Sequence, residues 1–241
     1  MAGHDRRPPS SPGLVLRNVS PPLRWADYGL IAFDMDSTLI TIECIDEIAD
    51  AAGRKAEVAA ITEAAMRGEI TDFKDSLRRR LALLKGVSTA QLQQVLDERL
   101  RISPGAETLV ATAKQHGLKV LLVSGGFSFF ADRVAERLGI DFVRSNLLAF
   151  DREGRLTGRV VPQFWGDICD GEAKRHMLLA TCERLNLQPS QAIAVGDGAN
   201  DLPMMGVAGL SVAYHAKPKV REQAMVSIEA GGLDRLLELF A

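Results

Sequence analysis

Two aspartates directly after a short apolar run constrain the fold of this chain most. The run Leu30–Phe33 predicts a buried strand, and Asp34-Met35-Asp36 stands at its carboxyl end. In open α/β sheets, functional residues gather at the carboxyl ends of parallel strands. Residues two apart in an extended chain point the same way, so both carboxylates can face one ligand. One can act as a nucleophile and the other as a proton donor, although two solvated loop acids would give the same pattern.

The rest of the chain alternates strand patterns with helix patterns. Apolar runs recur along it, and amphipathic segments separate them. A strand–helix–strand order predicts a doubly wound parallel sheet of Rossmann-like α/β type, covered by helices on both faces. Residues 146–161 surround Asp151-Arg152-Glu153-Gly154 and predict a β-hairpin. We expect strands at 29–34, 119–123, 141–143, 192–195 and 210–213, and helices at 127–138, 171–185 and 232–240.

A helical segment interrupts this alternation after the first strand. Residues 42–102 carry apolar residues at helical spacing, which predicts a small helical cap above the carboxyl edge of the sheet. The core is then made of residues 25–41 and 103–241. Residues 1–24 are rich in proline and predict a flexible leader. Breaks between the cap helices are expected at Gly53, Gly68 and Gly86.

Composition argues against several classes of function. Lys and Arg total 29 against 31 Asp and Glu, so we expect neither a nucleic-acid-binding surface nor a polybasic membrane patch. No apolar run approaches the roughly 20 residues that a membrane-spanning helix needs. The three cysteines and four histidines lack metal-ligand spacing, so we expect reduced thiols in a cytoplasmic protein and no zinc site.

A second acidic motif follows another expected strand. Gly196-Asp197-Gly198-Ala199-Asn200-Asp201 would join Asp34 and Asp36 if the two strands are neighbours. Clustered carboxylates repel one another, and their pKa values rise unless a cation neutralises them. Oxygen ligands without His or Cys favour Mg²⁺. A simple turn has the same Gly, Asn and Asp composition, so the segment alone leaves both interpretations open.

Two further segments can bind an anion. Ser124-Gly125-Gly126 ends an apolar strand before a helix, where free amides and a missing Cβ suit a phosphate. A helix N-cap with a tight turn gives the same sequence. Lys174 lies in the first turn of the helix expected at 171–185, where a cation opposes the helix dipole. It is either a solvated side chain or a fixed positive charge that faces a phosphate and the aspartates.

One arginine lies on an apolar helix face. On a helical wheel Arg80 falls with Leu77 and Leu84, whereas the two preceding arginines point elsewhere. A buried guanidinium needs a partner, and an internal acid is a more frequent one than a substrate carboxylate held by two hydrogen bonds. Glu43 lies on the polar side of its helix and Met66 in the core or at a helix end, so neither residue type indicates a function by itself.

Together these motifs resemble those of the haloacid-dehalogenase-like (HAD) phosphatases, and within them the phosphoserine phosphatase family. The resemblance covers about residues 29–240. Each motif alone is degenerate, but the ordered set is specific. The stretches that carry it are Asp34-Met35-Asp36-Ser37-Thr38, Ile42–Glu47, Ala65-Met66-Arg67-Gly68, Phe73, Ser76–Arg80, Ser124–Phe127, Lys174, Gly196–Asp201 and Tyr214–Pro218.

The resemblance implies a reaction and its catalytic residues. In that family the acid that matches Asp34 is the nucleophile, and the acid that matches Asp36 is the general acid and base. The Mg²⁺ ligands match Asp34, the backbone carbonyl of Asp36, and Asp197, and a supporting acid matches Asp201. The implied activity is Mg²⁺-dependent hydrolysis of O-phospho-L-serine to L-serine and phosphate through an aspartyl phosphate, the last step of serine biosynthesis.

The resemblance also implies a substrate site. Glu43 and Arg80 match the residues that hold the amino and carboxylate groups of the substrate. Many relatives carry N-terminal regulatory domains, for which residues 1–24 are too short, so we do not expect feedback through such a domain. The other implied substrate contacts are Ser124, Gly125 and Lys174 on the phosphate, Met66 and Phe73 on the cap side, and Asn200.

Other functions share these motifs. A phosphotransferase, or a phosphatase of another small phosphomonoester, would use the same residues, and phosphate release without an added acceptor separates hydrolysis from transfer. A non-catalytic phosphoserine sensor would need neither Asp34 nor Asp36, so their presence argues against it. A small molecule is the expected partner, and a homodimer is compatible with the sequence.

Overall fold

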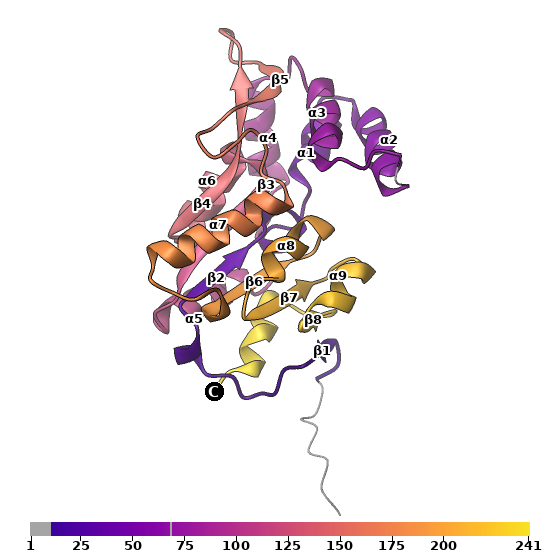
Figure 1. Ribbon diagram of the computed structural model, residues 1–241. Coiled ribbons are helices and arrows are strands. Elements are labelled where there is room, and N and C mark those ends of the chain that lie inside the picture. Colours follow the sequence, from indigo (N-terminus) through magenta and orange to yellow (C-terminus); the bar gives the residue numbers. More distant parts are fainter. Residues whose placement is uncertain (1–10, 68) are drawn as a thin grey trace, which may run out of the picture.

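The computed structural model describes residues 11–67 and 69–241, except for the side chain of Met66. One sheet runs through its centre in the order β1-β8-β7-β6-β2-β3-β4-β5 (Figure 1). Neighbouring strands are parallel except at the two edges, where β1 and β5 run antiparallel to their partners. This is the expected doubly wound α/β sheet. The strands are β1 (Leu14–Leu16), β2 (Leu30–Phe33), β3 (Lys119–Phe127), β4 (Phe142–Phe150), β5 (Leu156–Val161), β6 (Ala192–Gly196), β7 (Leu210–Tyr214) and β8 (Val226–Ile228).

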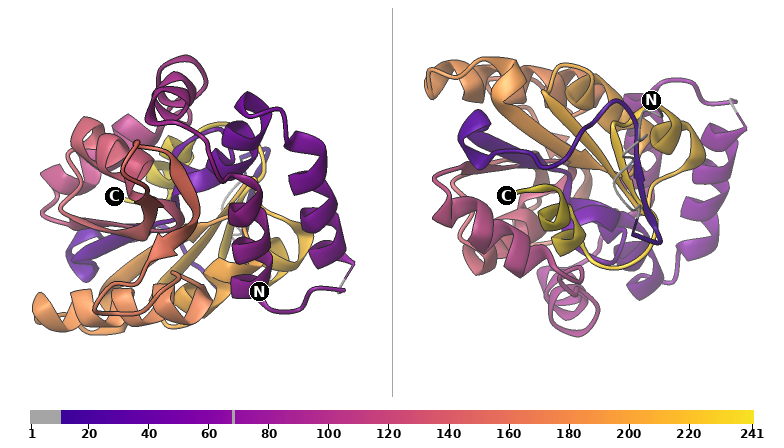
Figure 2. Two further views of the ribbon diagram at one scale, coloured as in Figure 1. Left: turned by 90° about the horizontal axis from the view of Figure 1, so that it is seen from above. Right: turned by 90° about the horizontal axis from the view of Figure 1, so that it is seen from below.

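Helices cover both faces of the sheet because alternate strand residues point to opposite layers. In β2, the buried side chains of Ile31 and Phe33 pack in the layer of α5 and α6, whereas Leu30 and Ala32 pack in the layer of α7, α8 and α9. Figure 2 shows the orange α7 and the pink α6 on opposite sides of the sheet. These helices are α5 (Ala106–Gln115), α6 (Ser128–Leu138), α7 (Gly171–Arg184), α8 (Leu202–Met205) and α9 (Pro218–Gln223).

In the described part of the chain, four α-helices lie between β2 and α5, where the helical segment is expected (Figure 1). They are α1 (Cys44–Ala51), α2 (Lys55–Met66), α3 (Phe73–Leu83) and α4 (Thr89–Glu98). The side chains of Asp72 and Ser88 cap the first turns of α3 and α4. Gly53 and Gly86 interrupt the helices in the left-handed region, as expected, whereas Gly68 lies outside the described residues. Within the described ranges, no helix has the length and apolar character of a membrane span.

The β4–β5 hairpin joins the edge of the sheet to the helical segment. Its strands surround the expected turn, in which Gly154 has a φ of 71°. The backbone of Leu156 donates to the Val87 carbonyl at 2.8 Å and accepts from the Gly86 N–H at 2.8 Å. The loop between α3 and α4 is therefore hydrogen-bonded to β5, and the two lie together at the top of Figure 1.

The structure departs from expectation at both ends of the chain. Residues 1–10 of the leader lie outside the described residues, but residues 14–16 form β1 and pair with β8. Neither strand was predicted, because a three-residue strand is too short to show an apolar alternation. The helix expected at 232–240 is a 3₁₀-helix over Leu233–Leu239.

A second departure concerns the glycine segment after residue 123. β3 continues to Phe127 and α6 begins only at Ser128, so Ser124-Gly125-Gly126 does not lie at a helix start. The pairing register between β3 and β4 shifts between Val123 and Phe127, and glycines make such a bulge possible. Gly126 directly precedes Phe127, the N-cap residue of α6, so the glycine segment ends one residue before that cap.

Candidate active site

The predicted motifs meet at the carboxyl edge of the sheet because their strands are neighbours. In β2, Phe33 is paired with Leu122 of β3 and with Val195 of β6. Asp34 follows Phe33 directly, and Gly196 is the last residue of β6. The three motifs that follow β2, β3 and β6 are far apart in the chain but therefore lie side by side at the carboxyl edge of the sheet.

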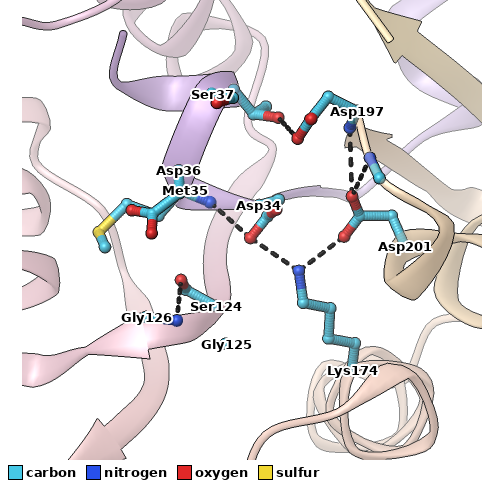
Figure 3. A network of polar contacts seen from close by, with 12 residues as sticks. Asp34, Met35, Asp36, Ser37, Ser124, Gly125, Gly126, Lys174, Asp197 and Asp201 are labelled. Atoms are coloured by element: carbon cyan, nitrogen blue, oxygen red, sulfur yellow. Dashed lines mark hydrogen bonds and ion pairs between the residues drawn. The ribbon is translucent and has the colours of Figure 1, made fainter. Parts of the chain in front are cut away.

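Asp34, Lys174 and Asp201 form a buried network of charges (Figure 3). Lys174 Nζ lies 2.7 Å from Asp34 Oδ1 and 2.6 Å from Asp201 Oδ1. The side chain of Lys174 is completely buried, which excludes the interpretation as a solvated lysine. Burial opposes its charge, but attraction to Asp201 and Asp34 outweighs burial and raises its pKa. Lys174 is therefore a fixed cation beside Asp34.

Asp201 organises the loop after β6. Its Oδ2 accepts hydrogen bonds from the backbone N–H groups of Asp197 at 3.1 Å and Gly198 at 3.0 Å, while its Oδ1 faces Lys174. Gly196 leaves room for this carboxyl group, because a Cβ there would lie 2.4 Å from it. Both oxygens of Asp201 are occupied by protein donors, an arrangement that suits a supporting acid.

A divalent cation fits the donor set of this loop. Asp34, Asp197 and Asp201 are buried and place carboxylate oxygens within 4.8 Å of one another. Burial and the charge of Asp201 raise the pKa of Asp34 well above its ordinary value and that of Asp197 to about 6. Since Lys174 supplies a single positive charge, the acids carry surplus negative charge that a hard, oxygen-seeking cation would neutralise. Asp201 has three protein donors, more than Asp34 or Asp197, so we take Asp34 and Asp197 as the side chains that would hold a metal.

Asp36 lies in a different environment from Asp34. The Cys44 N–H donates to its Oδ2 at 3.3 Å, and its Oδ1 is buried without a hydrogen-bond partner among the described residues. Burial first, and then the charge of Glu43, raises the pKa of Asp36 to about 8. The raised pKa favours the protonated form of this carboxyl group, which is the form that a general acid needs.

The end of β3 lies between Asp36 and the helical segment. Ser124 is buried, and its Oγ accepts a hydrogen bond from the Gly126 N–H at 2.8 Å (Figure 3). A Cβ on Gly126 would lie 3.3 Å from Asp36 Oδ2, and one on Gly125 would lie 3.2 Å from Cζ of Phe73 in α3. The glycines thus permit a close approach of this strand end to both sides of the site.

Arg80 lacks the internal partner that sequence reasoning favoured. Its guanidinium is half-buried and forms no ion pair among the described residues, and its Nε donates only to the Ser76 carbonyl at 3.4 Å. Burial lowers its pKa, and the more distant charges of Asp46, Glu43 and Asp36 oppose that effect. A desolvated cation without a close acid is an arrangement that an incoming carboxylate can complete.

Of the remaining expected binding residues, Glu43 and Asn200 have described side chains and Met66 does not. The Ser37 hydroxyl donates to Glu43 Oε1 at 2.6 Å, and the charge of Glu43 raises the pKa values of the neighbouring acids. Asn200 is half-buried, and its Oδ1 lies 2.4 Å from the position that a Cβ on Gly198 would take. Met66 ends α2, but its side chain lies outside the described residues.

Thr38 is a site residue to which sequence reasoning gave no role. It is completely buried, and its Oγ1 donates to Asp197 Oδ1 at 3.2 Å. The bond joins the first acidic motif to the last and fixes one oxygen of a candidate metal ligand. Its position inside the first motif was the single available signal, because a sequence does not show which distant group a hydroxyl will meet.

Comparison with known proteins identifies the class to which this fold and site belong. Residues 28–209 match the model of the haloacid dehalogenase-like hydrolases, so the chain belongs to that family. It is 70% identical to a phosphoserine phosphatase of Polaromonas sp. (strain JS666) over 229 residues. This alignment covers 95% of this chain and 97% of the relative. A phosphoserine phosphatase of Albidiferax ferrireducens is 69% identical, with coverage of 95% and 97%. A solved substrate-bound phosphoserine phosphatase complex aligns with a TM-score of 0.81 at 37% identity, over 89% of this chain and 99% of that one.

Proposed function

We propose that this chain is a cytoplasmic phosphoserine phosphatase, which hydrolyses O-phospho-L-serine to L-serine and phosphate with Mg²⁺. The observation that carries the proposal is the different surroundings of two neighbouring acids, since burial raises the pKa of both. Asp34 lies 2.7 Å from the buried cation of Lys174, whereas Asp36 Oδ2 accepts only from the Cys44 N–H and its Oδ1 has no described partner. The names of the close relatives support the choice of substrate.

Asp34 is the proposed nucleophile. Both described contacts of its carboxylate, from the Met35 N–H at 2.8 Å and from Lys174, go to Oδ1. One carboxylate oxygen would attack phosphorus in line. A P–O bond forms to Asp34 while the bond to the serine oxygen breaks, which gives an aspartyl phosphate.

Asp36 is the proposed general acid and then the general base. Because its raised pKa favours the protonated form, it can donate a proton to the departing serine oxygen. The resulting carboxylate accepts a proton from the water that attacks the aspartyl phosphate, so that phosphate leaves and Asp34 is regenerated. A pKa close to the working pH suits transfer in both directions.

Positive charge allows an anionic substrate to approach these acids. Bound Mg²⁺ would polarise the phosphoryl oxygens, and its proposed ligands are Asp34, the backbone carbonyl of Asp36, and Asp197. Lys174 offsets the charge of Asp34, and Asp201 keeps the lysine and the loop in place.

The two ends of the substrate are assigned to different parts of the chain. Arg80 would bind the serine carboxylate and Glu43 the ammonium group, each by opposite charge. Residues 42–102 would act as a cap that closes over the substrate and excludes bulk water. The proposed phosphate contacts are Ser124, Gly125 and Lys174, and the other proposed substrate contacts are Met66, Phe73 and Asn200.

A phosphate-release assay on small phosphomonoesters, with Mg²⁺ and after chelation, tests this function. We expect Mg²⁺-dependent release with the highest kcat/KM for O-phospho-L-serine. Asp34→Asn should reduce turnover to background with the fold intact, whereas Asp132→Asn, at an exposed position on α6, should leave it unchanged. A clear preference for another monoester would overturn the substrate, and substantial turnover by the Asp34 variant would overturn the nucleophile.

A further inference from the structure

A buried asparagine joins two segments that border the proposed phosphate site. Asn146 lies on β4 and is completely buried. Its Nδ2 donates to the Gly125 carbonyl at 2.8 Å, and its Oδ1 accepts from the Cys169 N–H at 2.8 Å. A carbonyl can only accept and an N–H can only donate, so this position needs a side chain that does both, as an amide does.

The bond to Gly125 fixes the orientation of one peptide group. The Gly125 carbonyl belongs to the same peptide unit as the Gly126 N–H, which donates to Ser124 Oγ at 2.8 Å. This peptide is therefore held at both ends. The Ser124 hydroxyl accepts a bond and keeps its own hydrogen for another acceptor. With glycine on both sides, little besides these bonds prevents the peptide from rotating.

The bond to Cys169 anchors the segment that leads to Lys174. Cys169 directly precedes Asp170, whose side chain caps α7 and whose carbonyl accepts from the Lys174 N–H at 2.9 Å. The same segment lies against the end of β3, because a Cβ on Gly125 would be 3.2 Å from the Cys169 carbonyl oxygen. The amide of Asn146 is thus a direct link between the Ser124 segment and the start of the helix that carries the buried lysine.

We propose that Asn146 is a positioning residue for phosphoryl transfer, which fixes the Gly125–Gly126 peptide and the Cys169 segment so that Ser124 and Lys174 converge on the phosphate. The inference rests on the proposed phosphatase function, because a phosphate must occupy this site. Asn146 acts through these two segments and not by contact with substrate. If the peptide rotated, the Gly126 N–H would no longer hold the Ser124 hydroxyl in the orientation that leaves its hydrogen for the phosphate. Replacing Asn146 should therefore weaken binding of the phosphoryl group and leave recognition of the serine part unchanged.

Two variants separate the two bonds. Asn146→Asp retains the acceptor for Cys169 and loses the donor to Gly125, whereas Asn146→Leu has a similar shape and loses both. We would measure the Kd of inorganic phosphate with Mg²⁺ by titration calorimetry, and kcat/KM for O-phospho-L-serine and for phosphoethanolamine. We expect phosphate affinity and both kcat/KM values to fall together, on the order of tenfold or more, as the loss of a buried hydrogen bond implies. The ratio between the two substrates should not change.

Gln163→Glu is the matched control. The Gln163 Nε2 donates to the Ser145 carbonyl at 2.9 Å, so this variant makes the same amide-to-acid change at a similar bond beside Asn146. It should bind phosphate as the wild type does.

The calorimetric stoichiometry counts folded sites, so the Kd describes the folded protein even where a variant is less stable. If both Asn146 variants bind phosphate as tightly as the wild type, Asn146 has only a structural role and the proposal is wrong. A wild-type chain that binds phosphate but does not hydrolyse O-phospho-L-serine would instead overturn the proposed function.

Discussion

In the proposed enzyme, a single half-buried arginine would separate recognition of phosphoserine from that of other phosphoesters. The Arg80 guanidinium has no ion pair among the described residues, although burial makes its charge costly. Asp46, Glu43 and Asp36 lie near enough to affect its pKa but do not pair with it. A substrate carboxylate would supply the missing partner, and that contact distinguishes phosphoserine from phosphoesters that lack a carboxylate.

Arg80→Ala should therefore lower kcat/KM for O-phospho-L-serine by about 30- to 1,000-fold, on the order of 2–4 kcal/mol, because a bidentate charged pair in a closed site is lost. Arg80→Lys should also be impaired, since lysine lacks the planar fork. Phosphoethanolamine, which has no carboxylate, should be hydrolysed by both variants almost as by the wild type. Steady-state kinetics on the two substrates decide the matter.

Arg79→Ala is the control for this comparison, because Arg79 is exposed and pairs with Asp75 one turn earlier at 2.8 Å. This variant should leave kcat/KM unchanged for both substrates. Equal losses on both substrates in Arg80→Ala would mean that Arg80 holds the helical segment together and does not bind a carboxylate.

At the residue scale, sequence reasoning found residues that the fold brings together more readily than it found the partners that they contact. The helical wheel placed Arg80 on an apolar face, as observed, but favoured an internal acid that the described residues do not provide. The bonds of Thr38 to Asp197 and of Asn146 to Gly125 link distant segments. They depend on strand order and on the bulge at the end of β3, which no local pattern specifies.

At the scale of elements, charges join α3 to the segment that precedes α7. Lys74 Nζ lies 3.3 Å from Asp167 Oδ1 and 3.6 Å from Asp170 Oδ2, and Arg78 Nη2 lies 2.5 Å from Asp167 Oδ2. These side chains are partly exposed, so each pair alone contributes little. Together they hold against the core the same helix that carries Phe73 and Arg80.

Removing the shared acid should weaken this attachment. In the wild type, the Ile168 N–H donates to Asp167 Oδ1 at 2.8 Å. Asp167→Asn loses the charge but retains an oxygen that can accept this bond. We expect KM for O-phospho-L-serine to rise about two- to fivefold with kcat nearly unchanged, because up to about 1 kcal/mol of attachment is lost. Added salt should then raise KM less than it does in the wild type, since the screened ion pairs are gone.

Glu107→Gln provides the comparison for that experiment. It breaks an exposed pair with Arg137 at 2.9 Å, which links α5 to α6 without involving α3. Neither KM nor its dependence on salt should change. If Asp167→Asn has the wild-type KM at low salt, the ion pairs do not control the position of α3.

The length of an element decided how well the sequence predicted it. The strand at Leu30–Phe33 is one residue shorter than expected at each end, and the helix at Gly171–Arg184 only at its C-terminus, because their apolar patterns are sustained. β1 and β8 have three residues each and pair across almost the whole chain, so no local signal marked them. The end of β3 was misplaced because a bulged strand with two glycines has the composition of a turn.

At the scale of the whole molecule, the fold gathers acids at one edge of the sheet and so makes stability depend on pH. Burial and neighbouring acids raise the pKa of Asp197 from 3.8 to about 6, and burial with the charge of Glu43 raises that of Asp36 to about 8. Between about pH 4 and pH 8 the folded protein therefore binds more protons than the unfolded chain. By linkage, the free energy of unfolding of the metal-free protein should fall as the pH rises through this window.

We therefore expect Mg²⁺ to stabilise the protein more at about pH 8 than at about pH 5, because it replaces protons on the acid cluster. Scanning calorimetry with excess Mg²⁺ and with a chelator gives the two Tm values at each pH. Asp197→Asn removes a carboxylate that is ionised and repelled at the higher pH. In chelator at about pH 8, the free energy of unfolding of this variant should exceed that of the wild type by on the order of 2–3 kcal/mol, or several degrees in Tm. Mg²⁺ should raise the Tm of the variant much less than that of the wild type. Glu107→Gln should follow the wild type throughout. If Mg²⁺ raises Tm equally at both pH values, or raises the Tm of Asp197→Asn as much as that of the wild type, these acids do not hold the metal.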